Sequence, residues 1–270
     1  MIAAVGFFDG VHLGHRVILE GADTAITFAN HPLSVLDPAS APRLILPLRD
    51  KIAAIKSCGV KNVIALDFTP AMAAMAAEDF AKEYLSAHST VRAGANWRFG
   101  KGGEGDAGTL ERLGIRAVTV PYATHSGLRI SSSRIREALS KGDVETAASM
   151  LGRPLSFTAG VKRGKGIGAK IGYPTVNLDF GGFTPCLANG VYAVKLNGKP
   201  GVSNFGFAPT MGEKAWPSPE MEVNLAEPPG MTAGDSVRIE MLRFIRPEMR
   251  FDSIDALKER IAKDREVAFG

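Results

Sequence analysis

The segment Gly164–Asn177, GKGIGAKIGYPTVN, is the part of the sequence around which the rest is organised. Four glycines and two lysines lie within its first nine residues, and Pro-Thr-x-Asn follows at once. Glycine lets a backbone approach a ligand closely, and exposed N–H groups beside lysine bind phosphate. On an extended chain Thr175 and Asn177 face the same side, and hard oxygen ligands beside phosphate suit Mg²⁺. The segment therefore predicts a Mg·ATP site, in which ATP is contacted by Gly164, Lys165, Gly166, Gly168, Lys170 and Gly172.

Neither of the two familiar phosphate-binding motifs matches this segment. Gly160 and Gly164 enclose three residues, whereas the Walker pattern needs four. The spacing Gly164-x-Gly166-x-Gly168 is too tight for the dinucleotide motif. Glycine and lysine alone leave a flexible basic hairpin tip open as the alternative, and the Pro-Thr-x-Asn that follows favours a functional site.

The sequence before this segment alternates between apolar runs and helical patterns. Ile2–Phe8 is a continuous apolar run, typical of a strand buried on both faces of a parallel sheet. Further strand patterns lie at 23–28, 60–67, 91–94 and 115–121, and helical patterns at 48–58 and 70–87. This alternation predicts a doubly wound parallel α/β domain, which we expect to span residues 1–152.

A tight turn follows the first predicted strand. Asp9-Gly10 ends the apolar run, and a helix begins near His12 and His15. A strand, a turn and a helix N-terminus form an anion site at the carboxyl edge of a sheet. The two histidines are three residues apart and share one face of a helical turn, so both can donate to phosphate oxygens. The turn residues expected to contact ATP are Gly6, Phe8, Asp9 and Gly10.

Two more stretches of the first half are rich in polar groups. GANWRFGKGG, residues 94–103, opens directly after a predicted strand. ISSSRIR, residues 130–136, places Ser131, Ser132 and Ser133 before Arg134 and Arg136 at a helix start. Simple capping is one explanation for the serines. However, arginine at a helix N-terminus opposes the helix dipole, and a bound anion such as triphosphate would remove that conflict. With no nucleophile pair in the sequence, the implied chemistry is in-line transfer catalysed by positioning and charge stabilisation.

Short strand patterns replace the alternation after Gly152. They lie at 155–161, 190–196, 200–207, 221–225 and 236–244, with an Asn197-Gly198 hairpin signal. About six antiparallel strands predict a small closed β-barrel over residues 153–270, followed by a helix that Ser253 caps. Glu220 and Glu222 face the same side of one strand. Near Mg·ATP one of them could take a proton from an attacking alcohol, and a solvated strand face is the alternative.

Composition limits the classes of partner. The chain has 270 residues, 45% hydrophobic and 22% charged, with a net charge of +4. No Lys/Arg block with interleaved aromatic residues occurs, so a nucleic-acid partner is not expected. The two cysteines, Cys58 and Cys186, show no metal-binding spacing and suggest free thiols in a reducing compartment. The first residues do not form a signal-peptide pattern, and no stretch approaches the roughly 20 apolar residues of a membrane helix. A cytoplasmic protein without a membrane partner is expected.

Motifs in both halves resemble one enzyme family. GFFDGVHLGH at Gly6–His15, GANWRFG at Gly94–Gly100 and ISSSRIR at Ile130–Arg136 are similar to the HxGH nucleotidylyltransferase module of prokaryotic bifunctional FAD synthetases. In the second half, GKGIGAKIGYPTVNL, GVYAV, GVSNFGFAPT, MEVNL and IRPEMRFDSIDALKERIAKD occur in the order seen in riboflavin kinases.

The resemblance implies a bifunctional riboflavin kinase/FAD synthetase. One ATP would phosphorylate riboflavin to FMN, and a second would adenylylate FMN to FAD with release of pyrophosphate. In the kinase half it implies that Thr175 and Asn177 bind Mg²⁺, that the Gly164–Gly172 loop covers ATP, and that Glu222 activates the ribityl 5′-hydroxyl. In the transferase half the triphosphate would be held by His12, His15, Ser132 and Arg136, and Asn96 would position adenine or phosphate.

Two alternatives remain open on sequence grounds. One is a riboflavin kinase with a vestigial transferase half, against which the intact HxGH and serine–arginine motifs argue. The other is a flavin-binding carrier without turnover, against which Thr175, Asn177 and Glu222 argue. The sequence departs from the family's usual Pro-His-Pro at 30–32, where it has Asn-His-Pro, and it has Pro228-Pro229-Gly230 near the place of the family's Tyr-Gly. It leaves the oligomeric state undetermined.

Overall fold

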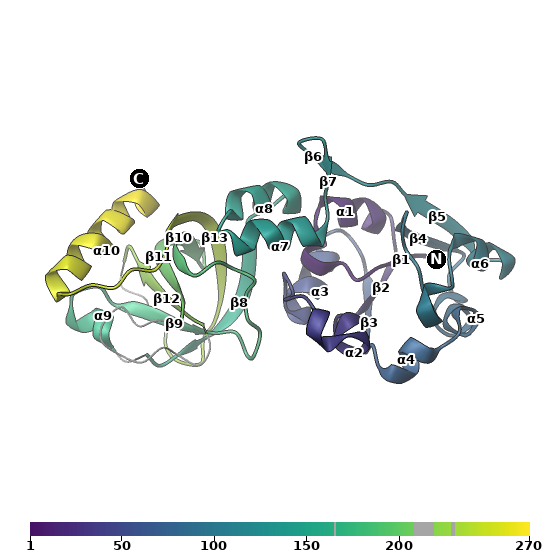
Figure 1. Ribbon diagram of the computed structural model, residues 1–270, viewed down its shortest axis with the longest axis horizontal. Helices are drawn as coiled ribbons and strands as arrows, with labels where there is room; N and C mark the ends of the chain where they lie inside the picture. The colour runs from purple at the N-terminus through teal and green to yellow at the C-terminus, as the bar shows by residue number, and fades with distance from the viewer. Residues whose placement is uncertain (165, 208–218, 228–229) are drawn as a thin grey trace. The chain divides into compact units, whose positions relative to one another are not determined.

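The computed structural model describes residues 1–164, 166–207, 219–227 and 230–270 (Figure 1). The chain divides into two compact units, Met1–Ser132 and Ser133–Gly270. In the part of the chain that the structure describes, no helix is long and apolar enough to span a membrane. Neither Cys58 nor Cys186 takes part in a disulfide among the described residues.

The first unit is built on a five-stranded parallel sheet in the order β3-β2-β1-β4-β5. Its strands are β1 (Ile2–Val5), β2 (Thr24–Phe28), β3 (Asn62–Leu66), β4 (Thr90–Gly94) and β5 (Arg116–Val120). The chain runs outward from β1 to β3 and then crosses back to β4 on the other side of β1. Ligands of doubly wound sheets bind at the carboxyl ends of the strands beside such a reversal. The order therefore places the HxGH segment, which follows β1, at that position.

Helices cover both faces of this sheet. Ala4 of β1 packs with Ile18 and Ile55 on one face, and Ala3 and Val5 pack with Phe80 on the other. The predicted doubly wound α/β fold is confirmed. The helical segments are η1 (Asp9–Val11), α1 (Leu13–Leu19), α2 (Leu33–Leu36), η2 (Pro38–Ser40), α3 (Leu48–Lys56), α4 (Pro70–Ala74), α5 (Ala77–Phe80), η3 (Ala81–Leu85), η4 (Lys101–Gly103) and α6 (Ala107–Arg112), and a small hairpin joins β6 (Thr124–His125) to β7 (Leu128–Arg129).

Two predicted segments differ in extent from the observed ones. The first strand ends at Val5 rather than Phe8, because Phe8 adopts a left-handed conformation with φ 54° that no strand contains. The helical pattern at 70–87 is divided into α4, α5 and η3. The division lies at Met75, which is extended and whose carbonyl accepts a hydrogen bond from Lys101 N at 2.7 Å. A tertiary contact thus interrupts a sequence of good helix formers.

The second unit contains a closed six-stranded barrel in the order β10-β11-β12-β9-β8-β13. Every neighbouring pair is antiparallel, as the sequence predicts. Asn197 and Gly198, with φ 49° and 81°, form the two-residue turn between β10 and β11, because such turns need positive φ at both positions. The elements are α7 (Ser132–Ser140, which begins in the first unit), α8 (Val144–Leu151), β8 (Leu155–Lys162), α9 (Ile167–Lys170), β9 (Thr175–Asp179), β10 (Gly190–Leu196), β11 (Lys199–Gly206), β12 (Glu220–Leu225), β13 (Ser236–Arg246) and α10 (Ile254–Phe269).

The C-terminal helix α10 lies against the outside of the barrel (Figure 1). Ser253 caps it by accepting a hydrogen bond from Ala256 N, as predicted. Asp264, only 2% exposed, fixes the helix to β13 by accepting hydrogen bonds from the Arg246 guanidinium, the shortest of them 2.7 Å. Arg260 donates to the same carboxylate at 3.0 Å. A buried charge so paired resists separation, because either partner left alone would be desolvated without compensation.

Candidate functional sites

A cavity of about 270 Å³ lies at the carboxyl edge of the sheet in the first unit. It brings together residues from β1, α1, the segment after β4 and the start of α7. Of the residues predicted from the sequence, its lining contains Gly6, Phe8, His12, His15, Asn96, Ser131 and Ser132. Three motifs spread over more than a hundred residues of sequence therefore form one site.

The two histidines of the HxGH segment are stacked. Their ring centroids are 3.5 Å apart and their planes 16° apart. His12 is the N-cap of α1, and its Nδ1 accepts a hydrogen bond from the backbone N–H of His15 at 3.2 Å. This bond leaves the proton of neutral His12 on Nε2, which is then a donor. His15 Nδ1 is buried and has no hydrogen-bond partner among the described residues.

Burial makes both histidines poor bases. It lowers the pKa of His12 from 6.5 to about 4, and the positive charge of Arg129 acts in the same direction. Desolvation is also the main reason why the pKa of His15 lies well below its ordinary value, with His12 and Lys51 contributing. Near pH 7 the pair is therefore neutral, and it can offer N–H donors to an anion rather than positive charge.

The loop between β1 and α1 has an unusual backbone. Phe8, Gly10 and Val11 all have positive φ, at 54°, 77° and 46°. Asp9 fixes the loop to the segment at Ile45. It is 2% exposed, and its Oδ1 accepts a hydrogen bond from Ile45 N at 2.9 Å. Ser132 Oγ donates to the Asp9 carbonyl at 3.1 Å, which joins the loop to the serine motif. Asp9 and Gly10 thus lie in the buried part of the loop, and their contact with ATP stays a prediction.

Several residues that sequence reasoning missed also line the cavity. Arg129 lies at the end of β7 with its guanidinium 3.5 Å from the centroid of the Tyr122 ring, and both residues belong to the lining. The β6–β7 hairpin brings Arg129 there. Its turn residues, Ser126 and Gly127, have φ 53° and 75°, so the Ser-Gly dipeptide was the available sequence signal.

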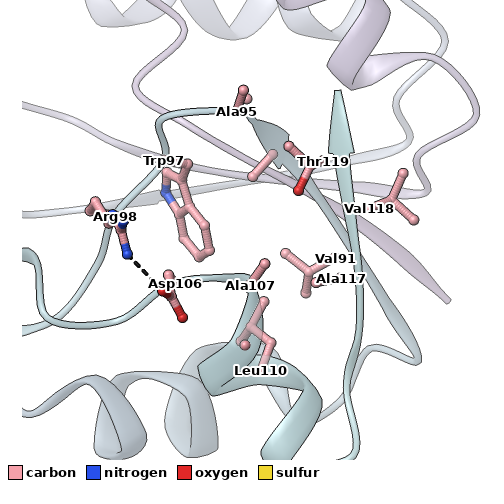
Figure 2. A pocket seen from close by; sticks show the side chains of 13 residues that line it. Val91, Ala95, Trp97, Arg98, Asp106, Ala107, Leu110, Ala117, Val118 and Thr119 are labelled. Carbon is pink, nitrogen blue, oxygen red and sulfur yellow. Dashed lines mark hydrogen bonds and ion pairs between the residues drawn. The ribbon is translucent and has the colours of Figure 1, made fainter. Parts of the chain in front are cut away.

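A second cavity, of about 200 Å³, shares Gly94 and Trp97 of its lining with the first (Figure 2). Trp97 lines both cavities and stacks on Phe99 with ring centroids 4.5 Å apart. Figure 2 shows its indole projecting toward Ala107 and Leu110, with the Arg98–Asp106 ion pair of 2.7 Å to one side. Asn96 lines only the larger cavity. The residue predicted to act with the histidines therefore shares their cavity.

The rest of the serine–arginine motif lies further along α7. Ser133, Arg134 and Arg136 belong to the second unit. Their predicted contact with triphosphate stays a prediction.

In the second unit, strand register brings the predicted kinase residues together. Asn177 of β9 is directly opposite Glu222 of β12, and Thr175 is opposite Asn224. Opposed residues of an antiparallel pair project to the same face, and so do residues two apart on one strand. Thr175, Asn177 and Glu222 therefore share one face of the barrel wall.

The structure also separates the two candidate carboxylates. Glu220 lies on the same face as Glu222, but its Oε1 accepts a hydrogen bond from Lys162 Nζ at 2.9 Å. Glu222 is the carboxylate opposite Asn177. The choice of Glu222 as the base, which the family resemblance implies, stays a prediction.

The glycine-rich loop packs directly on these side chains. A Cβ atom added to Gly164 would lie 2.6 Å from Asn177 Cγ and still closer to its Nδ2. One added to Gly168 would lie 3.2 Å from Thr175 Oγ1. Gly166 and Gly172 instead need glycine for their positive φ of 70° and 88°. Part of this loop is helical: α9 occupies Ile167–Lys170, and Lys170 is exposed. Lys165 lies outside the described residues.

Oxygen atoms on this face suit a hard divalent cation. The Thr175 hydroxyl, the Asn177 amide and the Glu222 carboxylate share the face, and the glycine backbone packs too closely on it to admit a side chain. Within the described ranges no group of three or more His, Cys, Asp or Glu residues gathers as a metal site. A cation held by one or two protein oxygens together with phosphate oxygens matches the usual binding mode of Mg²⁺.

Comparison with known proteins decides the family. The FAD synthetase family model matches residues 1–134, and the riboflavin kinase family model matches residues 151–269. The bifunctional riboflavin kinase/FMN adenylyltransferase of Bacillus subtilis is 36% identical over 287 residues, covering 99% of this chain and 91% of the relative. The chain belongs to the bifunctional riboflavin kinase/FMN adenylyltransferase family. The Escherichia coli K12 protein of the same name is 32% identical over 289 residues, with the same coverage of 99% and 91%.

A solved structure shares the whole architecture of this family member. The crystal structure titled as a macrolide-efflux protein from Streptococcus pneumoniae superposes with a TM-score of 0.87 at 29% identity, covering 100% of this chain and 93% of that one. The likeness carries the two-part fold to this chain.

The family assignment confirms the sequence predictions of fold, enzyme class and bifunctional character. Because family models match both halves, the assignment favours two activities over the single-activity and carrier alternatives.

The departure from the family's Pro-His-Pro at residues 30–32 has a structural explanation. Asn30 Nδ2 donates to the Phe68 carbonyl at 2.9 Å, and Phe68 N donates to Asn30 Oδ1 at 2.8 Å. Asn30 thus joins the loops that follow β2 and β3. Pro228 and Pro229 lie outside the described residues.

Proposed function

We propose that this enzyme makes FAD from riboflavin in two steps, each using one ATP. Residues on the Thr175–Asn177–Glu222 face transfer the γ-phosphoryl group of ATP to riboflavin, giving FMN and ADP. Residues of the histidine cavity transfer AMP from a second ATP to FMN, giving FAD and pyrophosphate. The convergence of Thr175, Asn177 and Glu222 beneath Gly164 and Gly168 carries the kinase assignment.

In the kinase half, Glu222 acts as general base. Its carboxylate accepts the proton of the ribityl 5′-hydroxyl as that oxygen attacks the γ-phosphorus, and ADP leaves. Thr175 and Asn177 hold the divalent cation, which we assign as Mg²⁺, and when bound the cation neutralises phosphate charge. Gly164, Gly166, Gly168 and Gly172 let the loop backbone approach the phosphates, with Lys165 and Lys170 as cationic neighbours.

In the transferase half, a phosphate oxygen of FMN attacks the α-phosphorus of ATP, and pyrophosphate departs. Neutral His12 donates its Nε2–H to phosphate oxygens. The His15 ring is stacked on the His12 ring. Ser131, Ser132 and Asn96 add polar groups around the same cavity, and Arg129 adds a charge. Ser133, Arg134 and Arg136 complete the triphosphate contacts, and catalysis rests on positioning and charge stabilisation.

The functional domains in this proposal are residues 1–152 and 153–270. Gly152, with φ 71°, ends α8, and the riboflavin kinase match begins one residue earlier. We also propose a cytoplasmic enzyme without a nucleic-acid or membrane partner. Its net charge of +4 is modest, and riboflavin, FMN and ATP are small molecules.

The test is to incubate the protein with Mg·ATP and riboflavin, and separately with Mg·ATP and FMN, and to resolve the flavins by chromatography. FMN and FAD in the first tube and FAD in the second are expected. FMN without FAD would support the single-activity alternative, and no new flavin in either tube would support the carrier. Omitting Mg²⁺ and adding Mn²⁺ or Ca²⁺ identifies the cation.

Matched variants separate the two sites. Glu222→Gln should stop FMN formation and leave FAD formation from supplied FMN, whereas Glu220→Gln should leave both activities measurable. His15→Ala should reduce FAD formation and leave FMN formation. If either Glu222→Gln or His15→Ala abolishes both activities in a folded protein, the assignment of two separate sites is wrong.

A further inference from the structure

A lysine is buried beneath the HxGH loop. Lys51 lies in the first turn of α3 and is 2% exposed, although lysine is rarely fully buried without partners. Its Nζ donates to the Phe28 carbonyl at 2.6 Å and to the Phe7 carbonyl at 3.2 Å. The ammonium group therefore donates hydrogen bonds to backbone carbonyls of two neighbouring segments.

Both carbonyls lie at the edge of the sheet where the histidine cavity opens. Phe28 is the last residue of β2, and Phe7 belongs to the loop that follows β1. Thr27 Oγ1 also donates to the Phe7 carbonyl, at 2.9 Å. Lys51 thus joins the loop after β1 to the end of β2, with Thr27 fixing the same oxygen.

The Phe7 side chain is fixed from two directions as well. Lys51 Nζ lies 4.0 Å from the centroid of its ring, a cation–π distance. The His31 ring packs edge-on against it, with centroids 4.8 Å apart and planes at 79°. Phe7 leads directly into Phe8, where the loop enters its run of positive φ. Strained backbone of this kind persists only where its surroundings determine it.

The charge of Lys51 also acts on its neighbours. The charged or titratable groups that act on it or respond to it are Asp9, which favours its protonated form, and His15, whose pKa it lowers. A buried positive charge beneath a phosphate-binding loop also raises the local potential for anions. Lys51 therefore influences both the shape of the loop and the protonation of His15.

We propose that Lys51 is a positioning residue for adenylyl transfer: its ammonium group fixes the Gly6–Val11 loop and thereby places His12 and His15 against the phosphates of ATP. The inference rests on the adenylyl-transfer activity proposed for the first unit. Lys51 itself touches no substrate in this scheme and acts through the Phe7 and Phe28 carbonyls.

A pH dependence follows from this arrangement. Burial lowers the pKa of Lys51 from 10.5 to about 8. Above that pH the neutral amine keeps weaker hydrogen bonds to the two carbonyls and loses its attraction to the Phe7 ring. The rate of FAD formation should therefore decline above about pH 8. The rate of FMN formation, which takes place in the barrel, should not show this decline.

The experiment compares wild type with Lys51→Met, Lys51→Arg and Lys56→Met. Lys56 is exposed at the other end of α3 and is the matched control. The kcat, and the KM for ATP, of FAD formation from FMN are measured from pH 6.5 to 9.5, with FMN formation from riboflavin as the second activity of the same molecules. Circular dichroism at pH 7 and retained FMN formation report the folding of each variant.

Lys51→Met should lower kcat/KM for ATP in FAD formation by about 10-fold to 100-fold, the size of a small misplacement of catalytic groups. It should lose the alkaline decline and keep FMN formation, and Lys56→Met should match wild type. Lys51→Arg, which stays charged across this pH range, should retain more activity and move the decline beyond pH 9.5.

Wild-type kcat/KM and pH profile in Lys51→Met would overturn the inference. So would a decline near pH 8 that persists in Lys51→Arg, a readout that does not depend on the folding of Lys51→Met. Absence of FAD with the wild-type protein would instead overturn the adenylyl-transfer function, and this inference with it.

Discussion

Gly164 offers a sharp test of the kinase site, because a single methyl group would enter the space between the loop and Asn177. In Gly164→Ala the new Cβ would lie 2.6 Å from Asn177 Cγ, about 1 Å inside ordinary carbon contact. Asn177 is 6% exposed and has little room to move away. The loop must therefore lift from the face that carries Thr175, Asn177 and Glu222.

The expected loss can be estimated from this displacement. Overpacking of a tight contact costs about 1–3 kcal/mol, and a shift of about 1 Å in a reacting group costs on the order of a hundredfold in rate. We therefore expect Gly164→Ala to lower kcat/KM for riboflavin phosphorylation roughly a hundredfold. FAD formation from supplied FMN should be unchanged, because that site lies in the other unit.

Gly160→Ala is the matched control. Gly160 lies on β8, four residues before Gly164, and the nearest atom to an added Cβ is Asp179 O at 3.8 Å. Neither glycine has a positive φ, so the comparison isolates steric contact from backbone strain. Initial rates of FMN formation over a range of ATP concentrations, followed by flavin chromatography, measure the effect. Wild-type phosphorylation by Gly164→Ala, or an equal loss in Gly160→Ala, would refute the packing argument.

Three further predictions concern stability and titration. Asp264→Ala should lower the free energy of unfolding of the second unit, measured in urea, by about 3 kcal/mol or more, because Arg246 then keeps a buried charge without its partner; Arg260→Ala, which removes the more exposed partner, should cost less. Lys51 has a folded pKa of about 8 against 10.5 for the unfolded chain, so between those values the unfolded state binds more protons and stability rises with pH. The wild-type free energy of unfolding minus that of Lys51→Met should increase by about 2 kcal/mol from pH 8 to 10, and a flat difference would contradict the buried-charge argument. An NMR titration should give His12 a midpoint of about 4, and a midpoint near 6.5 would show that its ring is hydrated.

Much of this protein could be derived from local sequence patterns. Apolar runs such as Ile2–Val5 and the Asn197-Gly198 dipeptide determine where strands and a tight turn form, because their causes lie within a few residues. The Pro-Thr-x-Asn spacing places Thr175 and Asn177 on one face for the same reason. A role for Gly164 and Gly168 in an ATP site could be predicted from the sequence. Their close packing against Asn177 and Thr175 could not.

Only the tertiary structure decided which distant residues meet. Nothing near Lys51 in the sequence indicates that its ammonium group reaches the carbonyls of Phe7 and Phe28, because those contacts follow from how α3 packs on the sheet. The left-handed conformation of Phe8 is likewise imposed by its surroundings rather than by its own preference. Glu220 and Glu222 are equivalent in a local pattern, and only the fold shows that Lys162 of another strand pairs with Glu220 and that Asn177 lies opposite Glu222. Local preferences act over a few residues, whereas burial and charge depend on every segment that folds against a group, and so the sequence determined the elements and motifs while the fold determined their partners.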